Sequence, residues 1–360
     1  LESFSIIYDL ILGIFLGIMI MTNTWDFLIY GLFMFILGLV LLGQKQVKFL
    51  NLFIYAIIIL VLAFLISLIW LYNFETISQG IALVSERSSL KELAILWSGH
   101  IIMSFIALYA AQNVSCNFDK KFNPIVLTLC ITAFLLLLLP EIIYVKDIYT
   151  SHPRANTMFK LTYKAFVLMS LLGGYAFSIL VNLREKAFLA NIIFLILCII
   201  ILGLLLYPKK AFYTFYQNFE EYKGLNGLKW YKNEFPDEWK IIKFLKKNWD
   251  GKNIIEASNE SYSKFNAIST FSGVPAVLGW ITHEWLWRGY LPISFRLNEI
   301  KEFYESKNLD FINNMIAKYN LGWLILTQNE KQKYNVDEYF LKDLGTVCFS
   351  SEHSCLVKIK

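Results

Sequence analysis

The chain has 360 residues, of which 57% are hydrophobic and 17% are charged, and its formal net charge is +5. Soluble domains are roughly 45–50% apolar and roughly 25% charged, so this composition excludes a disordered chain and disfavours an ordinary soluble enzyme. Residues 1–207 carry 22 charged side chains and residues 208–360 carry 39. We therefore expect a transmembrane helical domain at 1–207 and a soluble domain at 208–360. The net charge divides almost evenly between them, which argues against a nucleic-acid partner.

Seven apolar runs in the first part are long enough to cross a bilayer as helices, which takes about 20 residues. They lie near 4–22, 27–43, 49–72, 93–112, 124–143, 163–181 and 187–207. The chain begins at Leu1 and enters the first run almost at once. We therefore expect it to be the C-terminal part of a longer membrane protein.

The loops between these runs alternate in charge. The loops 44–48, 113–123 and 182–186 are short and basic, which is typical of the cytoplasmic side. The loops 23–26, 73–92 and 144–162 then lie on the outer side. Seven spans place residues 208–360 on that outer side too, so we expect a multi-pass protein of the cell membrane with an extracytoplasmic C-terminal domain.

The soluble part alternates helical and strand-like patterns, which indicates a small α/β domain. Helices are expected at 236–248, 298–305, 309–319 and 336–343, and strands at 254–258 and 322–327. A hairpin is expected from 345–350 and 354–359. Cys348 and Cys355 would either form a disulfide across this hairpin or remain two buried thiols.

Two outer loops contain candidate catalytic acids. Asp26, in the turn 23–26, is either a general base at the membrane surface or a helix cap. Glu141 and Asp147 lie at the start of the loop between the fifth and sixth apolar runs, as candidate bases or metal ligands. The same loop supplies Arg154, Asn156 and Lys160 for binding a phosphate. The alternative is a solvated loop whose lysines reach lipid head groups.

The segment 279–289 is dense in aromatic and charged residues. Aromatic faces, carboxylates and arginine together are typical of a site for a sugar or a lipid phosphate. The alternative is that the tryptophans seat the domain on the membrane. The candidate substrate-binding residues of this segment are Trp280, His283, Glu284, Trp287 and Arg288.

The segments 23–30, 97–99, 141–160, 254–258 and 272–289, in this order, resemble an uncharacterised family of archaeal and bacterial membrane proteins named for a Tyr-Tyr-Tyr motif. The resemblance covers the C-terminal half of that family, which is distantly similar to the GT-C glycosyltransferases. It implies a GT-C-like enzyme that transfers a sugar from a polyprenyl-phosphate donor at the outer membrane face to an acceptor that it leaves unidentified. It also implies a carboxylate base on the first outer loop of the family, often beside a divalent cation.

Two hypotheses follow from the sequence. The first is a glycosyltransferase with catalytic candidates Asp147, Glu141 and Asp26. The second is a non-catalytic membrane scaffold, or a component that carries lipids or exports a polymer. The first hypothesis predicts that the 141–160 loop and the 280–288 segment line one pocket, because a sugar phosphate needs both cations and aromatic faces.

Overall fold

The computed structural model describes residues 6–74, 76, 78–113, 123–148, 150–183, 188–217 and 224–360. Most of the basic loops 113–123 and 182–186 lie outside the described residues. The chain divides into two compact units, Leu1–Glu220 and Glu221–Lys360.

The first unit is mostly helical. Its helices are α1 (Ile6–Thr22), α2 (Thr24–Gly43), α3 (Phe49–Asn73), α4 (Leu90–Asn113), α5 (Asn123–Leu138), α6 (Ala155–Leu183), α7 (Phe188–Leu204) and α8 (Leu206–Tyr216). A short 3-10 turn, η2 (Leu139–Glu141), extends α5. Two short strands, β1 (Ile81–Leu83) and β2 (Ile143–Val145), lie in the loops before α4 and after η2.

Within the described residues, six helices are long and apolar enough to cross a membrane. They correspond to the second to seventh runs expected from the sequence, with α7 and α8 together forming the last. The first expected run is the helix α1, whose 17 residues give a length of about 25 Å, slightly less than the roughly 30 Å hydrocarbon core. The protein is therefore a multi-pass membrane protein with at least these six candidate spans.

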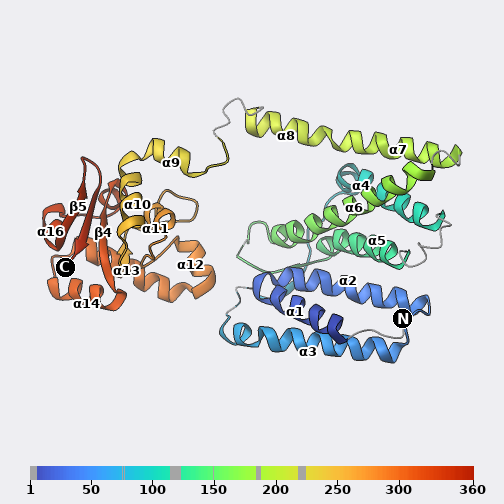
Figure 1. Cartoon of the computed structure of the whole chain (residues 1–360), viewed down its shortest axis with the longest axis horizontal. Helices are drawn as coiled ribbons and strands as arrows, with labels where there is room; N and C mark the ends of the chain where they lie inside the picture. The colour runs from blue at the N-terminus through green and yellow to red at the C-terminus, as the bar shows by residue number, and fades with distance from the viewer. Residues whose placement is uncertain are drawn as a thin grey trace. The chain divides into compact units, whose positions relative to one another are not determined.

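The helices of this unit pack in a row. In Figure 1, α1 lies between α2 and α3, α2 contacts α5, and α5 contacts α6, which in turn packs against α4 and α7. The contact of α1 with α3 is close because Gly13 and Gly17 face it. A Cβ at Gly13 would lie 2.7 Å from Cβ of Leu62, and one at Gly17 would lie 2.9 Å from the carbonyl oxygen of Ala63. Such small-residue contacts let membrane helices approach closely without side chains between them.

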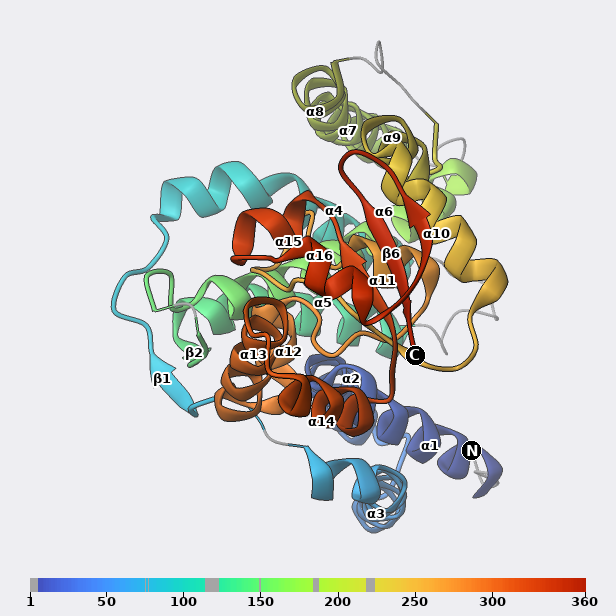
Figure 2. The ribbon, with the colours of Figure 1, turned by 90° about the vertical axis from the view of Figure 1, so that its left-hand side faces the viewer.

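The second unit is an α/β fold. Its helices are α9 (Leu228–Glu234), α10 (Pro236–Asn248), α11 (Ala267–Ser272), α12 (Ile281–Arg288), α13 (Tyr290–Glu305), α14 (Leu309–Tyr319), α15 (Gln328–Lys333) and α16 (Glu338–Asp343). Its strands are β3 (Asn253–Ile255), β4 (Leu321–Leu326), β5 (Gly345–Ser350) and β6 (Cys355–Ile359), paired in the order β3-β4-β6-β5. Strands β3 and β4 are parallel, whereas β6 is antiparallel to both β4 and β5. The hairpin of β5 and β6 is drawn in red in Figure 2.

The sheet has a hydrophobic core on each face, because successive strand residues point to opposite sides. Ile254, Trp323 and Ile325 pack on one face with side chains of α10 and α11. Ile255 and Leu324 pack on the other face with side chains of α13 and α14. All six residues of β4 are buried, as expected for a central strand covered on both sides.

Most of the predicted elements of this unit are confirmed. Helix α10 has the predicted ends, and the predicted hairpin forms. The predicted strand at 254–258 is too long, because β3 ends at Ile255 and Glu256 begins a buried loop. The predicted disulfide alternative is wrong. Cys348 and Cys355 are free thiols, and Cys355 pairs with Ser350 across the hairpin rather than with Cys348.

Candidate functional site

A two-stranded ribbon joins the two long loops at one end of the first unit. Strand β1 pairs antiparallel with β2, so Ile81 lies opposite Val145 and Leu83 lies opposite Ile143. The amide of Lys146 donates to the carbonyl of Gly80 at 2.8 Å. Gly80 has a φ of +99°, a conformation that favours glycine. The ribbon therefore fixes the loop before α4 against the loop between α5 and α6.

Arg154 and Glu141 form the most buried ion pair in this region. Nη1 of Arg154 lies 2.6 Å from Oε2 of Glu141, and the two side chains are 21% and 11% exposed. Nη2 of Arg154 donates to the hydroxyl of Ser88 at 3.1 Å, and the amide of Ser88 donates to the Glu141 carboxylate at 2.8 Å. The sequence placed Glu141 and Arg154 in one loop, but it did not indicate Ser88. The guanidinium is largely committed to this network, which leaves it less able to bind a phosphate than expected.

Three polar residues, Asn156, Lys160 and Lys164, follow one another at four-residue intervals along α6 and have different roles. Asn156 donates to Oδ2 of Asp147 at 3.0 Å. Nζ of Lys164 lies 2.9 Å from Oδ1 of Asp26, off the direction of a hydrogen bond, and 5.3 Å from the centre of the Tyr30 ring. Lys160 lies between them at i, i+4 spacing on α6 and is half-buried. In the described part of the chain, Lys160 forms no ion pair.

Asp26 is not a helix cap. It lies in the first turn of α2, whose N-cap residue is Asn23, and the Asn23 amide donates to Oδ2 of Asp26 at 3.0 Å. The carboxylate is therefore held between Asn23 and Lys164. This arrangement joins the α1–α2 turn to α6.

An apolar cavity of about 150 Å³ lies beside these polar residues. Trp25 and Leu28 of α2 line it, together with Tyr144 of β2 and with Thr157 and Leu161 of α6. Thr157 is fixed in turn, because its hydroxyl accepts a hydrogen bond from the amide of Val145 at 3.0 Å. Lys160 directly precedes the lining residue Leu161 on α6. A cation and an apolar cavity on one helix suit an amphiphile with an anionic head.

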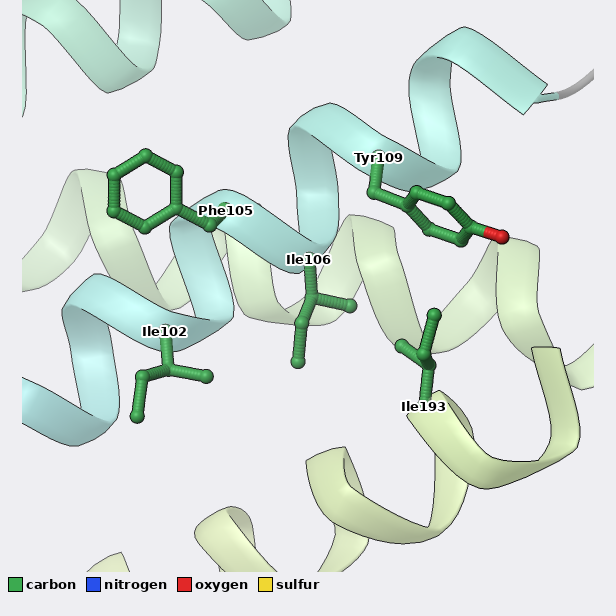
Figure 3. Close-up of a pocket in the computed structure, with 5 residues that line it drawn as sticks. All are labelled: Ile102, Phe105, Ile106, Tyr109 and Ile193. Carbon is green, nitrogen blue, oxygen red and sulfur yellow. The ribbon is translucent and has the colours of Figure 1, made fainter. Parts of the chain in front are cut away.

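A second cavity, of about 250 Å³, lies between α4 and α7. Figure 3 shows Ile102, Phe105, Ile106 and Tyr109 from α4 and Ile193 from α7 around it. Its lining is hydrocarbon apart from the Tyr109 hydroxyl, and it includes no titratable acid or amine. These five lining residues therefore offer hydrocarbon contacts and no carboxylate or amine for catalysis.

The predicted 280–288 cluster forms most of helix α12, and its members divide into two groups. Glu284 and Arg288 pair with each other one turn apart, and Oε1 of Glu284 accepts from the amide of Gly279 at 3.3 Å. Trp287 is 67% exposed. Trp280 and His283 instead belong to a separate group with Ser261 and Tyr262, because the Ser261 hydroxyl bonds to Nδ1 of His283 and the Tyr262 ring contacts both other rings.

Three buried glutamates lie under the carboxyl ends of β3 and β4. Oε1 of Glu256 accepts from the Asn266 amide at 3.2 Å and from the backbone amide of Ser269 at 3.3 Å. Burial raises the pKa of Glu256 to about 7; the Glu330 carboxylate adds to this increase, and hydrogen bonds from Ser269 and Asn266 oppose it. Glu330 accepts hydrogen bonds from the amides of Ala257 and Thr327 at 2.8 and 2.7 Å, so it joins the two strand ends.

The third buried glutamate, Glu238, accepts from the Tyr231 hydroxyl. Burial raises the pKa of Glu238 as well. Of the three, only Glu256 lies in a segment that the sequence predicted to be a strand. The local sequence gives little sign of the other two, because Glu238 and Glu330 occupy the first turns of α10 and α15, where acids are common for reasons of capping and helix dipole.

Among the described residues, no three His, Cys, Asp or Glu side chains gather closely enough to hold a metal ion. Asp26 and Glu141 are paired with Lys164 and Arg154 instead.

The predicted site residues fall in both units. Asp26, Glu141, Asp147, Arg154, Asn156 and Lys160 lie in the first unit, and Trp280, His283, Glu284, Trp287 and Arg288 lie in the second. The pocket shared by the two segments therefore stays a prediction.

The helices and the composition define a multi-pass integral membrane protein. Residues 3–126 and 108–169 match a protein family described as "Uncharacterized membrane protein (DUF2298)". The match lies within the first unit, so the chain is similar there to an uncharacterised family of integral membrane proteins. No curated protein and no solved structure matches the chain.

Proposed function

We propose that the protein is a GT-C-like glycosyltransferase that takes a sugar from a polyprenyl-phosphate donor at the outer face of the cell membrane. In this proposal the chain spans the membrane seven times and the second unit is extracytoplasmic. The close contact of Gly13 and Gly17 with α3 supports α1 as a further span, because small residues at such contacts are typical of helices packed in lipid.

The observation that carries this proposal is the position of Lys160. It lies on α6 between Asn156, which bonds to Asp147 of the preceding loop, and Lys164, which pairs with Asp26 of α2. The apolar cavity lined by Thr157 and Leu161 is adjacent on the same helix. A polyprenyl phosphate has the matching chemistry, because its hydrocarbon fits an apolar cavity and its phosphate pairs with an ammonium group. Arg154 would then support the loop rather than carry the phosphate.

We assign the general base to Asp147. Asp26 and Glu141 form ion pairs with Lys164 and Arg154 that join separate segments of the unit, so we give these two acids a structural role. The Asp147 carboxylate lies in the loop before α6 and accepts a hydrogen bond at 3.0 Å from the side chain of Asn156, one turn before Lys160 on the same helix. In the reaction, Asp147 takes the proton of an acceptor hydroxyl, the hydroxyl oxygen bonds to the anomeric carbon, and the bond from that carbon to the phosphate oxygen breaks. The polyprenyl phosphate leaves with the electron pair.

The second unit would bind the sugar or the acceptor. Trp280 and His283 supply rings for this contact, Trp287 adds an exposed ring, and Glu284 and Arg288 supply hydrogen-bonding groups. No step in this scheme requires a metal ion.

The test uses the full chain in proteoliposomes with polyprenyl-phosphate mannose and polyprenyl-phosphate glucose as donors, each labelled in the sugar. We expect donor-dependent release or transfer of label. Asp147→Asn should abolish it while photo-crosslinking of polyprenyl phosphate persists, and Lys160→Ala should weaken the crosslinking. Glu86→Gln is the matched control, because Glu86 is an exposed acid in the loop that contains β1. Absence of both turnover and crosslinking would refute the proposal.

The alternative is a non-catalytic role as a scaffold, a lipid carrier or an export component. The pairing of Asp26 and Glu141 with cations favours it, since these acids then serve structure rather than chemistry. Specific crosslinking of polyprenyl phosphate, without turnover of either donor and without an effect of Asp147→Asn, would support a lipid carrier.

A further inference from the structure

Three aromatic rings form a small cluster on the second unit, which we call the ring platform: Tyr262, Trp280 and His283. Their centroids are 5.6 Å apart for Tyr262 and Trp280, 5.3 Å for Tyr262 and His283, and 5.5 Å for Trp280 and His283. Each ring therefore contacts the other two. None of the three belongs to the buried cores that cover the sheet.

Two of these rings are fixed by hydrogen bonds. The indole Nε1 of Trp280 donates to the carbonyl of Phe265 at 2.9 Å, and Nδ1 of His283 bonds to the hydroxyl of Ser261. The amide of Ile281 donates to the carbonyl of Asn259 at 3.0 Å, which joins the loop after β3 to the start of α12. The platform is thus formed in advance and does not depend on a ligand to assemble it.

Tyr262 is placed in a way that packing does not explain. Its side chain is 86% exposed, and its φ of +62° lies in the left-handed region that non-glycine residues seldom adopt. An exposed ring gains little from burial, so the fold obtains no core contact in return for this conformation. Unusual backbone conformations of this kind cluster at ligand sites.

The location also points to a ligand. The platform is built from the loop that follows β3 and from the start of α12. The segment just before α12 runs parallel to β3, because Ala276 forms a bridge with Ile254. Ligands of open α/β sheets bind in the crevice outside the carboxyl ends of parallel strands. The ring platform occupies this part of the second unit.

The polar groups around the rings select the kind of ligand. The Thr282 hydroxyl donates to Oε2 of Glu260 at 2.6 Å, which leaves the other oxygen of this exposed carboxylate available as an acceptor. Ser261 adds a hydroxyl. A carboxylate at the rim disfavours an anionic ligand, whereas hydroxyl groups of a sugar can donate to it. The C–H face of a pyranose, which carries partial positive charge, suits the negative face of an aromatic ring.

We propose that the ring platform binds a pyranose ring of an uncharged glycan. The proposal that the platform binds a glycan stands without the proposed transferase activity. The further assignment of this glycan as the acceptor of the transferred sugar rests on that proposed activity. The site extends the predicted contacts Trp280 and His283 to Tyr262, Ser261 and Glu260, and it does not include Glu284 or Arg288, which pair with each other.

The test uses the full chain in nanodiscs of an uncharged lipid, with cellotetraose and mannotetraose as probes in saturation-transfer NMR. We expect saturation of the sugar C–H protons and a dissociation constant on the order of 1 mM, typical of weak recognition. Tyr262→Gly should reduce the affinity at least tenfold while leaving the fold intact, because glycine adopts the left-handed conformation more readily than tyrosine. Tyr339→Ala should have no effect; Tyr339 is 88% exposed on α16, so it is a matched tyrosine outside the platform.

Two results would overturn this proposal. One is an absence of saturation transfer to both tetrasaccharides, or transfer that Tyr262→Gly leaves unchanged. The other is quenching of Trp280 fluorescence by brominated lipids, because such quenching would mean that the platform lies in the membrane. The contribution of Trp280 is the part of the total quenching that is lost in Trp280→Phe. Either result leaves the transferase test unaffected, because that test measures release of label from the donor.

Discussion

Arg154 and Glu141 lie at opposite ends of the loop between α5 and α6, and their side chains meet at 2.6 Å with little exposure to solvent. Ser88, more than fifty residues earlier in the chain, bonds to both of them. The pair therefore closes its own loop and also attaches it to the loop before α4. Its role in stability can be measured separately from any role in binding.

Arg154→Ala should destabilise the first unit by about 1–3 kcal/mol, because it leaves the Glu141 carboxylate buried without its cation. Arg154→Ala combined with Glu141→Gln should cost less than the two single changes added together, since the double variant has no unpaired charge. Thermal unfolding of the purified protein in detergent measures both. Additive effects would show that the ion pair is energetically unimportant.

Gly17→Ala should weaken the packing of α1 on α3, because the new Cβ would lie 2.9 Å from the carbonyl oxygen of Ala63. Gly31→Ala is the control, since a Cβ there meets nothing within 4 Å. Gly31→Ala should even stabilise α2, by roughly 0.5–1 kcal/mol, through the higher helix propensity of alanine. Unfolding in an SDS titration distinguishes the two. Equal effects would mean that α1 does not pack closely on α3.

The stability of the second unit should fall as the pH rises from about 4.5 to about 7. Burial raises the pKa of Glu256 from an ordinary value near 4.5 to about 7, so the folded state holds this proton more tightly than the unfolded chain. Such a contribution is fully present below the unfolded pKa and is lost as the pH rises through the folded pKa. The shift corresponds to a loss on the order of 2–4 kcal/mol. Hydrogen exchange of the β4 amides measures it.

Glu256→Gln should flatten this pH dependence while keeping an oxygen that accepts from Asn266 and Ser269. Glu238 has a raised pKa too, so some slope should remain. A slope as steep as that of the unchanged protein would show that Glu256 is not the group responsible.

A cysteine at position 246 should react with a membrane-impermeant reagent in intact cells, and a cysteine at position 48 should not. Lys246 is exposed in the last turn of α10, and Lys48 is exposed at the start of α3, in a predicted inner loop. Lys246→Cys and Lys48→Cys are each made in a chain without other cysteines. The reverse pattern of labelling would refute the proposed orientation and, with it, a site on the outer face.

The sequence was sufficient to predict the elements whose signals are local. Helix α10 could be placed at both ends, because Pro236 begins it, acids follow in its first turn, and lysines lie in its last. The long helices followed from apolar runs that have to satisfy their own backbone in lipid. The interior strand β4 was predicted within one residue, since a short continuous apolar run is typical of a strand buried on both faces.

Features made by distant contacts could not be predicted. Strands β1 and β2 have three residues each and pair across about sixty residues, so neither shows a strand pattern alone. Ser88 is an ordinary loop serine until the fold brings Arg154 to it. Tyr262 lies in a loop without periodicity. Neither the tyrosine nor its neighbours in the sequence indicate its left-handed backbone conformation. For the same reason the sequence grouped Trp280 with Arg288, although in the fold Arg288 pairs with Glu284 and Trp280 contacts His283.

The ribbon of β1 and β2 also restricts how the bundle can open. It links the segment before α4 to the segment between η2 and α6 by backbone hydrogen bonds that run from Gln79 and Lys146 to Val84 and Ile142. Separating these two segments would require several backbone hydrogen bonds to break together, whereas α2 and α5 meet through an apolar cluster that includes Ile29 and Leu136. A lipid that enters the bundle from the bilayer would therefore meet less resistance between α2 and α5 than between the two loops joined by the ribbon.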